Sequence, residues 1–238
     1  MKNSLVKQDK PYKHWQYLDA HTGDRLRIVP ERGGLITQWR CNGREVLYFD
    51  LERFKLKGKS IRGGIPVLFP ICGDLPENLL SLPQGHFPMN QHGFARDLPW
   101  RINNLDDQNG VSLSLKANKQ TKLSFPFLFT LEMQIKIEKN ALSINTFVSN
   151  CGEQKMPFSF GLHPYFLVSS LDNIDIQGLP ATCQNHLDMT MTDTNSQLEK
   201  LPQGIDFLTS SEGPVSMTDS HTGARIEMNT QYPMNLAV

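Results

Sequence analysis

The stretch FTLEMQIKIEKNALSINTFV at 129–148 decides the class of fold. In residues 129–137 every second side chain is apolar and the side chains between them are polar, which places the apolar set on one face of a β-strand. Lys139-Asn140 then suits a tight turn, and residues 142–148 continue the same spacing. The stretch therefore predicts an antiparallel β-hairpin with one buried face and one wet face.

Shorter strand patterns recur along the chain, and helical spacing never persists for more than about two turns. The further strand candidates are 26–29, 35–39, 45–49, 111–115, 174–177 and 225–229. Many short strands joined by long loops, with no linker between them, are typical of an antiparallel β-sandwich. The sequence therefore predicts an all-β fold, a single large antiparallel β-sandwich domain over residues 1–238.

Two similar segments, DAHTGD at 19–24 and DSHTGA at 219–224, each precede a short apolar run. An aspartate can cap a turn with its side chain, and a glycine tolerates a positive φ, so both segments suit a hairpin turn. The copies lie too far apart in the sequence for a solenoid repeat. We therefore predict two turns in which His21 and His221 are exposed.

The composition excludes several classes of protein. Hydrophobic residues make up 39% of the chain and charged residues 20%, as in a soluble globular protein. The 24 basic side chains balance the 24 acidic ones, so no basic field for nucleic acid is expected. No apolar run approaches the roughly 18 residues of a membrane span, and the first residues lack the apolar core of a signal peptide. We expect a cytoplasmic protein, a monomer, that binds neither nucleic acid nor membrane.

The four cysteines, Cys41, Cys72, Cys151 and Cys183, are scattered along the chain. None belongs to a C-x-x-C pair of the kind found in zinc and redox sites, and a chain of this size needs no disulfide. We predict four reduced thiols, most of them buried, and no metal site.

Residues 50–100 are rich in Gly, Pro and polar side chains, and long loops in a compact domain are more often functional than idle. Within them, IRGGIPVLFPICG at 61–73 sets Arg62 and two glycines against an apolar run. Gly63 and Gly64 allow close approach of the backbone, while the prolines of this run argue against a central strand. Two interpretations stay open: a tight corner in which Arg62 pairs with a carboxylate, or an arginine that faces a ligand, with the glycines bringing its backbone close.

Two further motifs each contain one histidine. QHGFAR at 91–96 places His92 before a glycine and an aromatic residue, and FGLHPYF at 160–166 places His163 among aromatic residues. Apolar surroundings disfavour the charged imidazole and lower its pKa towards the range that is useful for proton transfer near neutrality. Taken singly, each is more often a structural histidine that bonds to the backbone.

Together the three motifs resemble the aldose 1-epimerase (galactose mutarotase-like) superfamily. The resemblance rests on IRGGIPVLFP (61–70), HGFAR (92–96) followed by Trp100, and HPYF (163–166). RGGIP and HGFAR are most similar to the hexose-6-phosphate mutarotase branch. The resemblance implies a large antiparallel β-sandwich whose long loops form a sugar groove, no cofactor, and interconversion of the α and β anomers of an aldose. In that reaction a base takes the proton of the C1 hydroxyl and an acid protonates the ring oxygen.

The resemblance also implies roles for individual residues. His163 matches the general acid at the ring oxygen, and His92 matches a second active-site histidine that helps to hold or protonate the sugar. Arg62 and Arg96 match groove arginines, which in the phosphosugar branch face the 6-phosphate, an anion that suits the planar guanidinium. Asp206 matches an acidic residue that accepts hydrogen bonds from sugar hydroxyls.

Two departures leave alternatives open. Pro164 follows His163 as in the free-aldose branch, so a hexose and a hexose 6-phosphate both stay candidate substrates, with a slight preference for the phosphosugar. The general base of the family is a glutamate on a strand near the C-terminus. Glu212 and Glu227 are poor candidates, because one is expected in a turn and the other on the wet face of a strand. We expect the last strands and the base beyond Val238. The alternative is a non-catalytic carbohydrate-binding relative.

Overall fold

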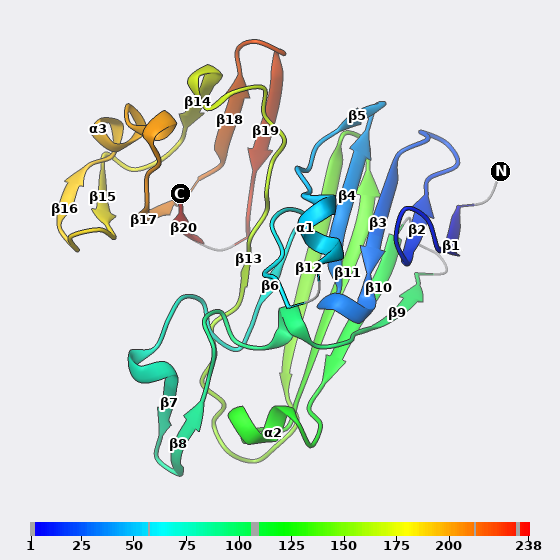
Figure 1. Ribbon diagram of the computed structural model, residues 1–238, viewed down its shortest axis with the longest axis vertical. Coiled ribbons are helices and arrows are strands. Elements are labelled where there is room, and N and C mark those ends of the chain that lie inside the picture. The colour runs from blue at the N-terminus through cyan, green and yellow to red at the C-terminus, as the bar shows by residue number, and fades with distance from the viewer. Residues whose placement is uncertain (1–2, 57, 106–109, 212, 232–233) are drawn as a thin grey trace. The chain divides into compact units, whose positions relative to one another are not determined.

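The computed structural model describes residues 3–56, 58–105, 110–211, 213–231 and 234–238. They form two compact units, Met1–Leu167 and Val168–Val238, and each is described by itself. Strands dominate both units and the helices are few and short (Figure 1). None of the helices in the described ranges is long and apolar enough to cross a membrane. The predicted all-β fold is confirmed as a mostly β fold with few, short helices, and the prediction of a single domain stays a prediction.

Two main sheets make up most of the first unit. The first sheet has the order β1 (Ser4–Gln8), β2 (His14–Leu18), β3 (Arg25–Val29), β4 (Leu35–Cys41) and β5 (Arg44–Glu45). The second has the order β12 (Ala141–Asn150), β11 (Phe129–Glu138), β10 (Gly110–Lys116) and β9 (Arg101–Asn104). One hydrophobic cluster includes Leu26 and Ile28 of β3 together with Leu131 and Met133 of β11. The two sheets of this unit therefore enclose a shared core.

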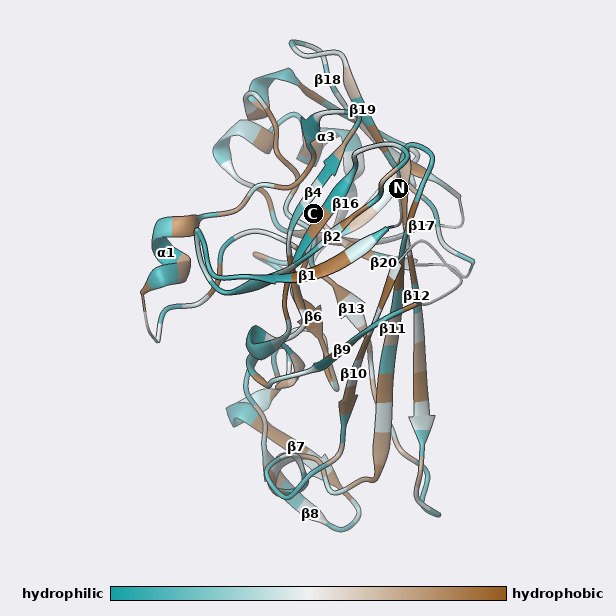
Figure 2. Ribbon diagram, turned by 90° about the vertical axis from the view of Figure 1, so that its right-hand side faces the viewer, coloured by the Kyte–Doolittle hydropathy of each residue, from teal (hydrophilic) through white to brown (hydrophobic). Residues whose placement is uncertain are grey.

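The hairpin predicted from residues 129–148 is confirmed. β11 pairs with β12 in antiparallel register, from Phe129 opposite Asn150 to Glu138 opposite Ala141. Its apolar side chains are buried at every second position, and Figure 2 shows the alternating hydropathy along the strand. β10 pairs with the other edge of β11, so this strand is central in its sheet. The alternation of apolar and polar residues along β11 therefore reflects the burial of one face of the strand.

The other elements of the first unit are short. They are η1 (Pro30–Arg32), α1 (Leu51–Lys55), β6 (Val67–Leu68), η2 (Pro76–Asn78), β7 (Leu79–Leu82), β8 (Gly85–Pro88), η3 (Ala95–Asp97), α2 (Thr121–Ser124) and β13 (Gly161–Leu162). The strand predicted at 45–49 is only partly confirmed. β5 ends at Glu45, and beyond it Leu47 and Phe49 form single bridges to Phe166 and Gly63. Residues 46–49 therefore do not continue the strand, because Leu47 and Phe49 pair with two different segments.

The second unit contains two small antiparallel sheets. One has the order β14 (Ile174–Gln177), β18 (Val215–Asp219) and β19 (Ala224–Met228), and the other has the order β16 (Met191–Asp193), β15 (Thr182–Asn185), β17 (Phe207–Ser211) and β20 (Met234–Ala237). The short helices are η4 (Leu171–Asn173), α3 (Thr194–Leu198) and η5 (Leu201–Gln203). The strands predicted at 174–177 and 225–229 are confirmed to within one residue.

Both predicted aspartate turns are confirmed. In each, the Oδ1 atom of Asp19 or Asp219 accepts hydrogen bonds from the backbone N–H groups two and three residues further on, at 2.8 to 3.2 Å. The glycine four residues after the aspartate has a φ of +76° in the first turn and +67° in the second. His21 and His221 are exposed, so neither contributes to a buried site.

The cysteines correct one prediction. All four are free thiols, but Cys72 and Cys151 are exposed and only Cys183 is buried. Cys72 lies in the loop that follows β6, and Cys151 comes directly after the last residue of β12. Loop positions carry these two thiols to the surface, so the prediction that most are buried is wrong.

Candidate functional site

The segment 61–70 is the centre of the site, because two other parts of the first unit run alongside it. On one side β13 pairs with β6. The pairing continues beyond β13, where the N–H of His163 donates to the Pro66 carbonyl at 3.0 Å and the N–H of Tyr165 donates to the Gly64 carbonyl at 2.9 Å. This ladder places His163 and Tyr165 beside the arginine and glycines of the segment.

The motif at 91–96 lies against the same segment. The carbonyl of Phe69 accepts hydrogen bonds from the N–H groups of Phe94 and Ala95 at 3.0 and 3.1 Å. Gly93 forms a parallel bridge with Phe69. Both histidine motifs, which are far apart in the sequence, therefore flank one apolar run.

The two glycines of this segment lie where other backbone segments approach closely. A Cβ atom on Gly63 would lie 2.5 Å from the Cα of Phe49, and one on Gly64 would lie 2.3 Å from the carbonyl oxygen of Ile36. Their φ angles are +113° and +71°. The glycines therefore allow close approach of neighbouring backbone segments, as predicted. That they bring the backbone of Arg62 close to a ligand stays a prediction. The side chain of Arg62, by contrast, is exposed.

A pocket of about 290 Å³ opens in the first unit where these segments meet. The charged residues in its lining are Arg32, Lys59, Arg62, Arg96 and Asp97. His92, His163 and Tyr165 line it as well. Four cations against one carboxylate make the pocket electropositive, although the net charge of the whole chain is zero. The site therefore suits an anionic ligand.

Among the residues that the structure describes, three of the four cations have no carboxylate partner. Arg96 donates from Nη2 to the Gln91 carbonyl at 2.9 Å, and its Nε lies 4.0 Å from a carboxylate oxygen of Asp97. Within the described ranges, Arg32, Lys59 and Arg62 form no ion pair with a carboxylate. The interpretation that pairs Arg62 with a carboxylate is therefore not supported among the described residues.

Arg32 and Lys59 were not predicted from the sequence. Arg32 reaches the pocket because Gly33 packs so closely on η3 that a Cβ would lie 2.2 Å from the carbonyl oxygen of Arg96. Its guanidinium lies 4.9 Å from the centroid of the Phe54 ring, a cation–π contact that orients it. The sequence contains a pattern that could have identified it, since Arg-Gly-Gly occurs at 32–34 as well as at 62–64. No comparable pattern marks Lys59.

The two histidines meet in this pocket. Their ring centroids lie 6.3 Å apart with the planes at 81°. The ring of His163 also stacks on Tyr165, two residues further along the same strand face, with centroids 4.8 Å apart and planes at 15°. His92 has a left-handed backbone, with a φ of +62°, which is unusual for a residue other than glycine. The two imidazoles thus share one pocket, while their chemical roles stay predictions.

Both imidazoles have a pKa below the ordinary value for histidine. Burial is the main cause for His163; an interaction with its own backbone raises its pKa, and the charges of Arg96 and Arg62 lower it further. For His92 burial again comes first, followed by the charges of Arg96 and His163, and Asp74 acts in the opposite direction. The direction predicted for His163 is confirmed, with the arginines as an additional cause.

Asp206 belongs to the second unit, where one of its carboxylate oxygens lies 3.0 Å from Nδ1 of His186. Its predicted contact with sugar hydroxyls stays a prediction. Glu227 is exposed on β19 and lies 3.3 Å from Arg225, as expected for a wet-face residue, and Glu212 lies outside the described residues. The base expected beyond Val238 stays a prediction. Among the residues with described positions, no group of three or more His, Cys, Asp or Glu side chains could hold a metal ion.

Comparisons with known sequences agree with this geometry. A family model described as "Aldose 1-epimerase" matches residues 17–238. A protein of Cenchrus ciliaris named "Putative glucose-6-phosphate 1-epimerase" is 29% identical over 160 residues, which is 62% of this chain and 45% of that protein. A protein of Escherichia coli K12 with the same name is 31% identical over 152 residues, 62% of this chain and 47% of that protein. The chain thus spans about half the length of these curated relatives.

Solved structures show the same fold. The Slr1438 protein from Synechocystis sp. PCC 6803 is 32% identical, with a TM-score of 0.86 over 100% of this chain and 84% of that chain. A galactose mutarotase-like protein from Lactobacillus casei ATCC 334 has a TM-score of 0.74 at 19% identity, over 98% and 82% of the two chains, and bears on the fold alone. The fold is therefore galactose mutarotase-like.

Proposed function

Because the chain belongs to the aldose 1-epimerase family, we propose that the protein interconverts the α and β anomers of a hexose and that it prefers a hexose 6-phosphate. The observation that carries the choice of substrate is a histidine-lined pocket with four cations and one carboxylate. A free hexose has no charge to balance these cations, whereas a phosphate dianion pairs well with guanidinium groups. The monomeric state and the cytoplasmic location stay predictions.

The proposed mechanism assigns proton transfer at the ring oxygen to His163 and the ligand contacts to the cations. The pyranose opens when a base removes the proton of the C1 hydroxyl and an acid protonates the ring oxygen, and rotation about C1–C2 before reclosure yields the other anomer. His163 is proposed as the acid, held in orientation by its stack on Tyr165. Arg62 and Arg96, joined by Arg32, are proposed to hold the phosphate.

The function can be tested by NMR exchange between the anomeric protons of glucose 6-phosphate. We expect exchange well above the spontaneous rate in the presence of protein, and slower exchange with glucose. Binding that shifts the sugar resonances without accelerating exchange would reject the enzyme and favour a non-catalytic carbohydrate-binding relative. Equal acceleration of both sugars would retain the enzyme and reject the phosphosugar preference.

Arg62→Ala is expected to lower kcat/KM for glucose 6-phosphate about 10- to 100-fold, because a hydrogen bond to a charged group contributes roughly 1.5–3 kcal/mol. The kcat/KM for glucose should hardly change, because glucose carries no phosphate. Steady-state anomer exchange with both sugars measures the difference.

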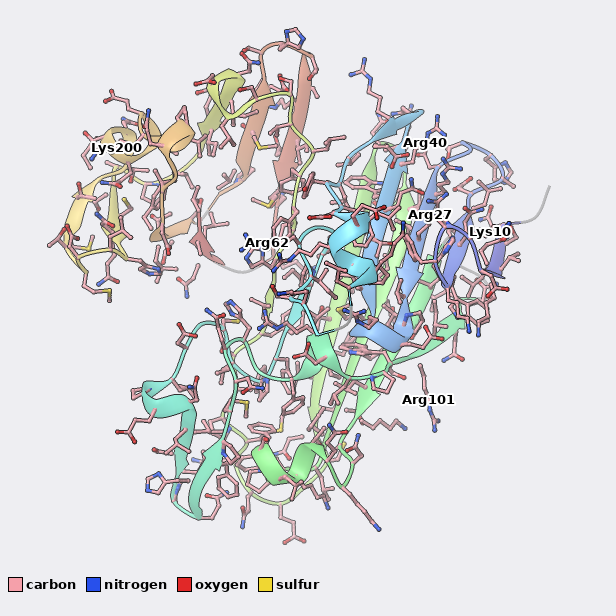
Figure 3. All side chains as sticks on the ribbon, viewed as in Figure 1. Lys10, Arg27, Arg40, Arg62, Arg101 and Lys200 are labelled. Atoms are coloured by element: carbon pink, nitrogen blue, oxygen red, sulfur yellow. The ribbon has the colours of Figure 1, made fainter. Side chains whose placement is uncertain are left out.

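Arg101→Ala is the matched control for this substitution. Arg101 is an exposed arginine at the start of β9, and it lies well apart from Arg62 in Figure 3. Its removal takes away the same formal charge without touching the pocket, so neither sugar should be affected. If Arg62→Ala lowers kcat/KM equally for both sugars, this arginine does not bind the phosphate.

Inorganic phosphate is expected to raise the pKa of His163. Burial first, and then the charges of Arg96 and Arg62, depress this pKa in the free protein. A bound dianion would offset both charges, so the protonated imidazole becomes less costly. Titration of the histidine ring protons by NMR, with and without phosphate, measures the shift. His21 is the internal reference, because it is exposed in a turn. A His163 pKa that stays constant while other pocket resonances move with phosphate would contradict the electrostatic coupling.

A further inference from the structure

His92 is held on two sides by a single residue of another loop. Its backbone N–H donates to the carbonyl of Gly73 at 2.8 Å, and the N–H of Gly73 donates to Nδ1 of the His92 ring at 2.9 Å. These two bonds close the base of the excursion 73–92, which contains the β7–β8 hairpin (Figure 1). The imidazole therefore has a fixed orientation and no freedom to exchange its ring nitrogens.

The chemistry of the second bond determines where the ring proton lies. A backbone N–H can only donate, so Nδ1 of His92 must present a lone pair to Gly73. In a neutral imidazole with Nδ1 unprotonated, the proton resides on Nε2. Among the described residues no protein group accepts a hydrogen bond from this Nε2, and the His92 side chain lines the pocket. The one unused donor of the ring is thus available to a ligand.

We propose that His92 acts as a neutral hydrogen-bond donor to the ligand through Nε2–H, and that the backbone amide of Gly73 is the positioning group that sets this tautomer. The proposal rests on the proposed function, since it assigns a role within the same pocket. If Nδ1 of His92 were protonated, its N–H would point at the N–H of Gly73. His92 is therefore not the base, and it does not relay a proton to His163. The acceptor is an oxygen of the sugar or of its phosphate.

The charges around the ring agree with a neutral His92. Arg96, on its own segment, and His163, on the segment beyond β13, both disfavour the imidazolium, while Asp74, next to Gly73, favours it. Burial is the largest cause of the lowered pKa of His92. The left-handed φ of +62° at His92 is retained although it is unfavourable for a histidine, as expected where tertiary contacts impose the geometry.

The tautomer can be read directly by NMR on protein labelled with ¹⁵N in histidine and glycine. Long-range ¹H–¹⁵N correlation at neutral pH should show His92 protonated on Nε2 and unprotonated on Nδ1, with a coupling across the hydrogen bond to the Gly73 amide nitrogen. A proton on Nδ1, or on both nitrogens, would overturn the proposal. This measurement needs no sugar, so it is independent of whether the protein anomerises one.

A pair of substitutions separates the donor role from the role of closing the loop. In His92→Asn, the side-chain oxygen takes the place of Nδ1 and can still accept the hydrogen bond from the Gly73 N–H. Asparagine also tolerates a positive φ. The pocket, however, loses the donor at Nε2. The amide nitrogen of His92→Gln takes the place of Nε2 and restores a donor. We expect unchanged melting for His92→Asn with about a tenfold loss of kcat/KM, and partial recovery in His92→Gln. Full activity in His92→Asn would show that His92 only closes the loop.

Discussion

Replacing His163 with alanine is expected to lower the rate constant for anomer exchange about a hundredfold or more, while the affinity for the sugar changes far less. Proton transfer to the ring oxygen is needed only in the transition state, so its loss reduces kcat and not ground-state binding. The ring also fills part of the pocket wall against Tyr165, which accounts for a small change in affinity. Rates from NMR exchange and affinities from titration calorimetry measure the two effects separately.

His21→Ala is the control for this substitution. It removes the same side chain from an exposed turn of the same unit, and should leave both rate and affinity unchanged. Loss of affinity in His163→Ala that equals the loss of rate would mean that His163 only binds the sugar. A rate that does not fall at all would remove His163 from the chemistry.

Gly93→Ala is expected to lower the free energy of unfolding by about 4 kcal/mol or more. The glycine has a φ of +73°, and a Cβ there would lie 2.2 Å from the carbonyl oxygen of Phe69 and 2.7 Å from Cδ of Pro70. Neither contact can relax easily, because Phe69 and Pro70 are buried in the segment at the centre of the site. Denaturant unfolding of the purified variant measures the loss.

Gly23→Ala provides a comparison at nearly the same backbone angle. Its φ is +76°, but a Cβ at this position would meet nothing within 4 Å. The cost should therefore be only the left-handed strain of alanine, about 1–2 kcal/mol. The difference in the free energy of unfolding between Gly93→Ala and Gly23→Ala therefore measures the cost of the steric clash at residue 93. Similar losses at both positions would show that the Phe69 backbone moves aside, and that the approach of Gly93 does not constrain the site.

Predictions of local structure and predictions of burial or packing differ in how far they depend on distant parts of the chain. The hairpin at 129–148 and both aspartate turns follow from spacing within a few residues, and the structure confirms them. The prediction that most of the four cysteines are buried was wrong, since the apolar character of a side chain does not determine whether its loop faces solvent. Close backbone approach at Gly63 and Gly64 was predicted correctly, but which segments approach them could not be predicted, because these neighbours come from other parts of the sequence.

The sequence by itself determined the strand-rich class of fold, through period-two alternation, and pointed to His92, His163, Arg62 and Arg96 through motifs that resemble a family. Only the tertiary structure decided which groups share the pocket and how they are held, because long-range backbone pairing sets those distances. The ladder beside 61–70 and the contacts of 93–95 with Phe69 bring the two imidazoles to 6.3 Å. The packing of Gly33 on η3 adds Arg32, and the amide of Gly73 fixes the ring of His92. Apart from the Arg-Gly-Gly at 32–34, no sequence pattern marks these contacts, since backbone amides and carbonyls are the same at every residue and only the fold decides which of them meet.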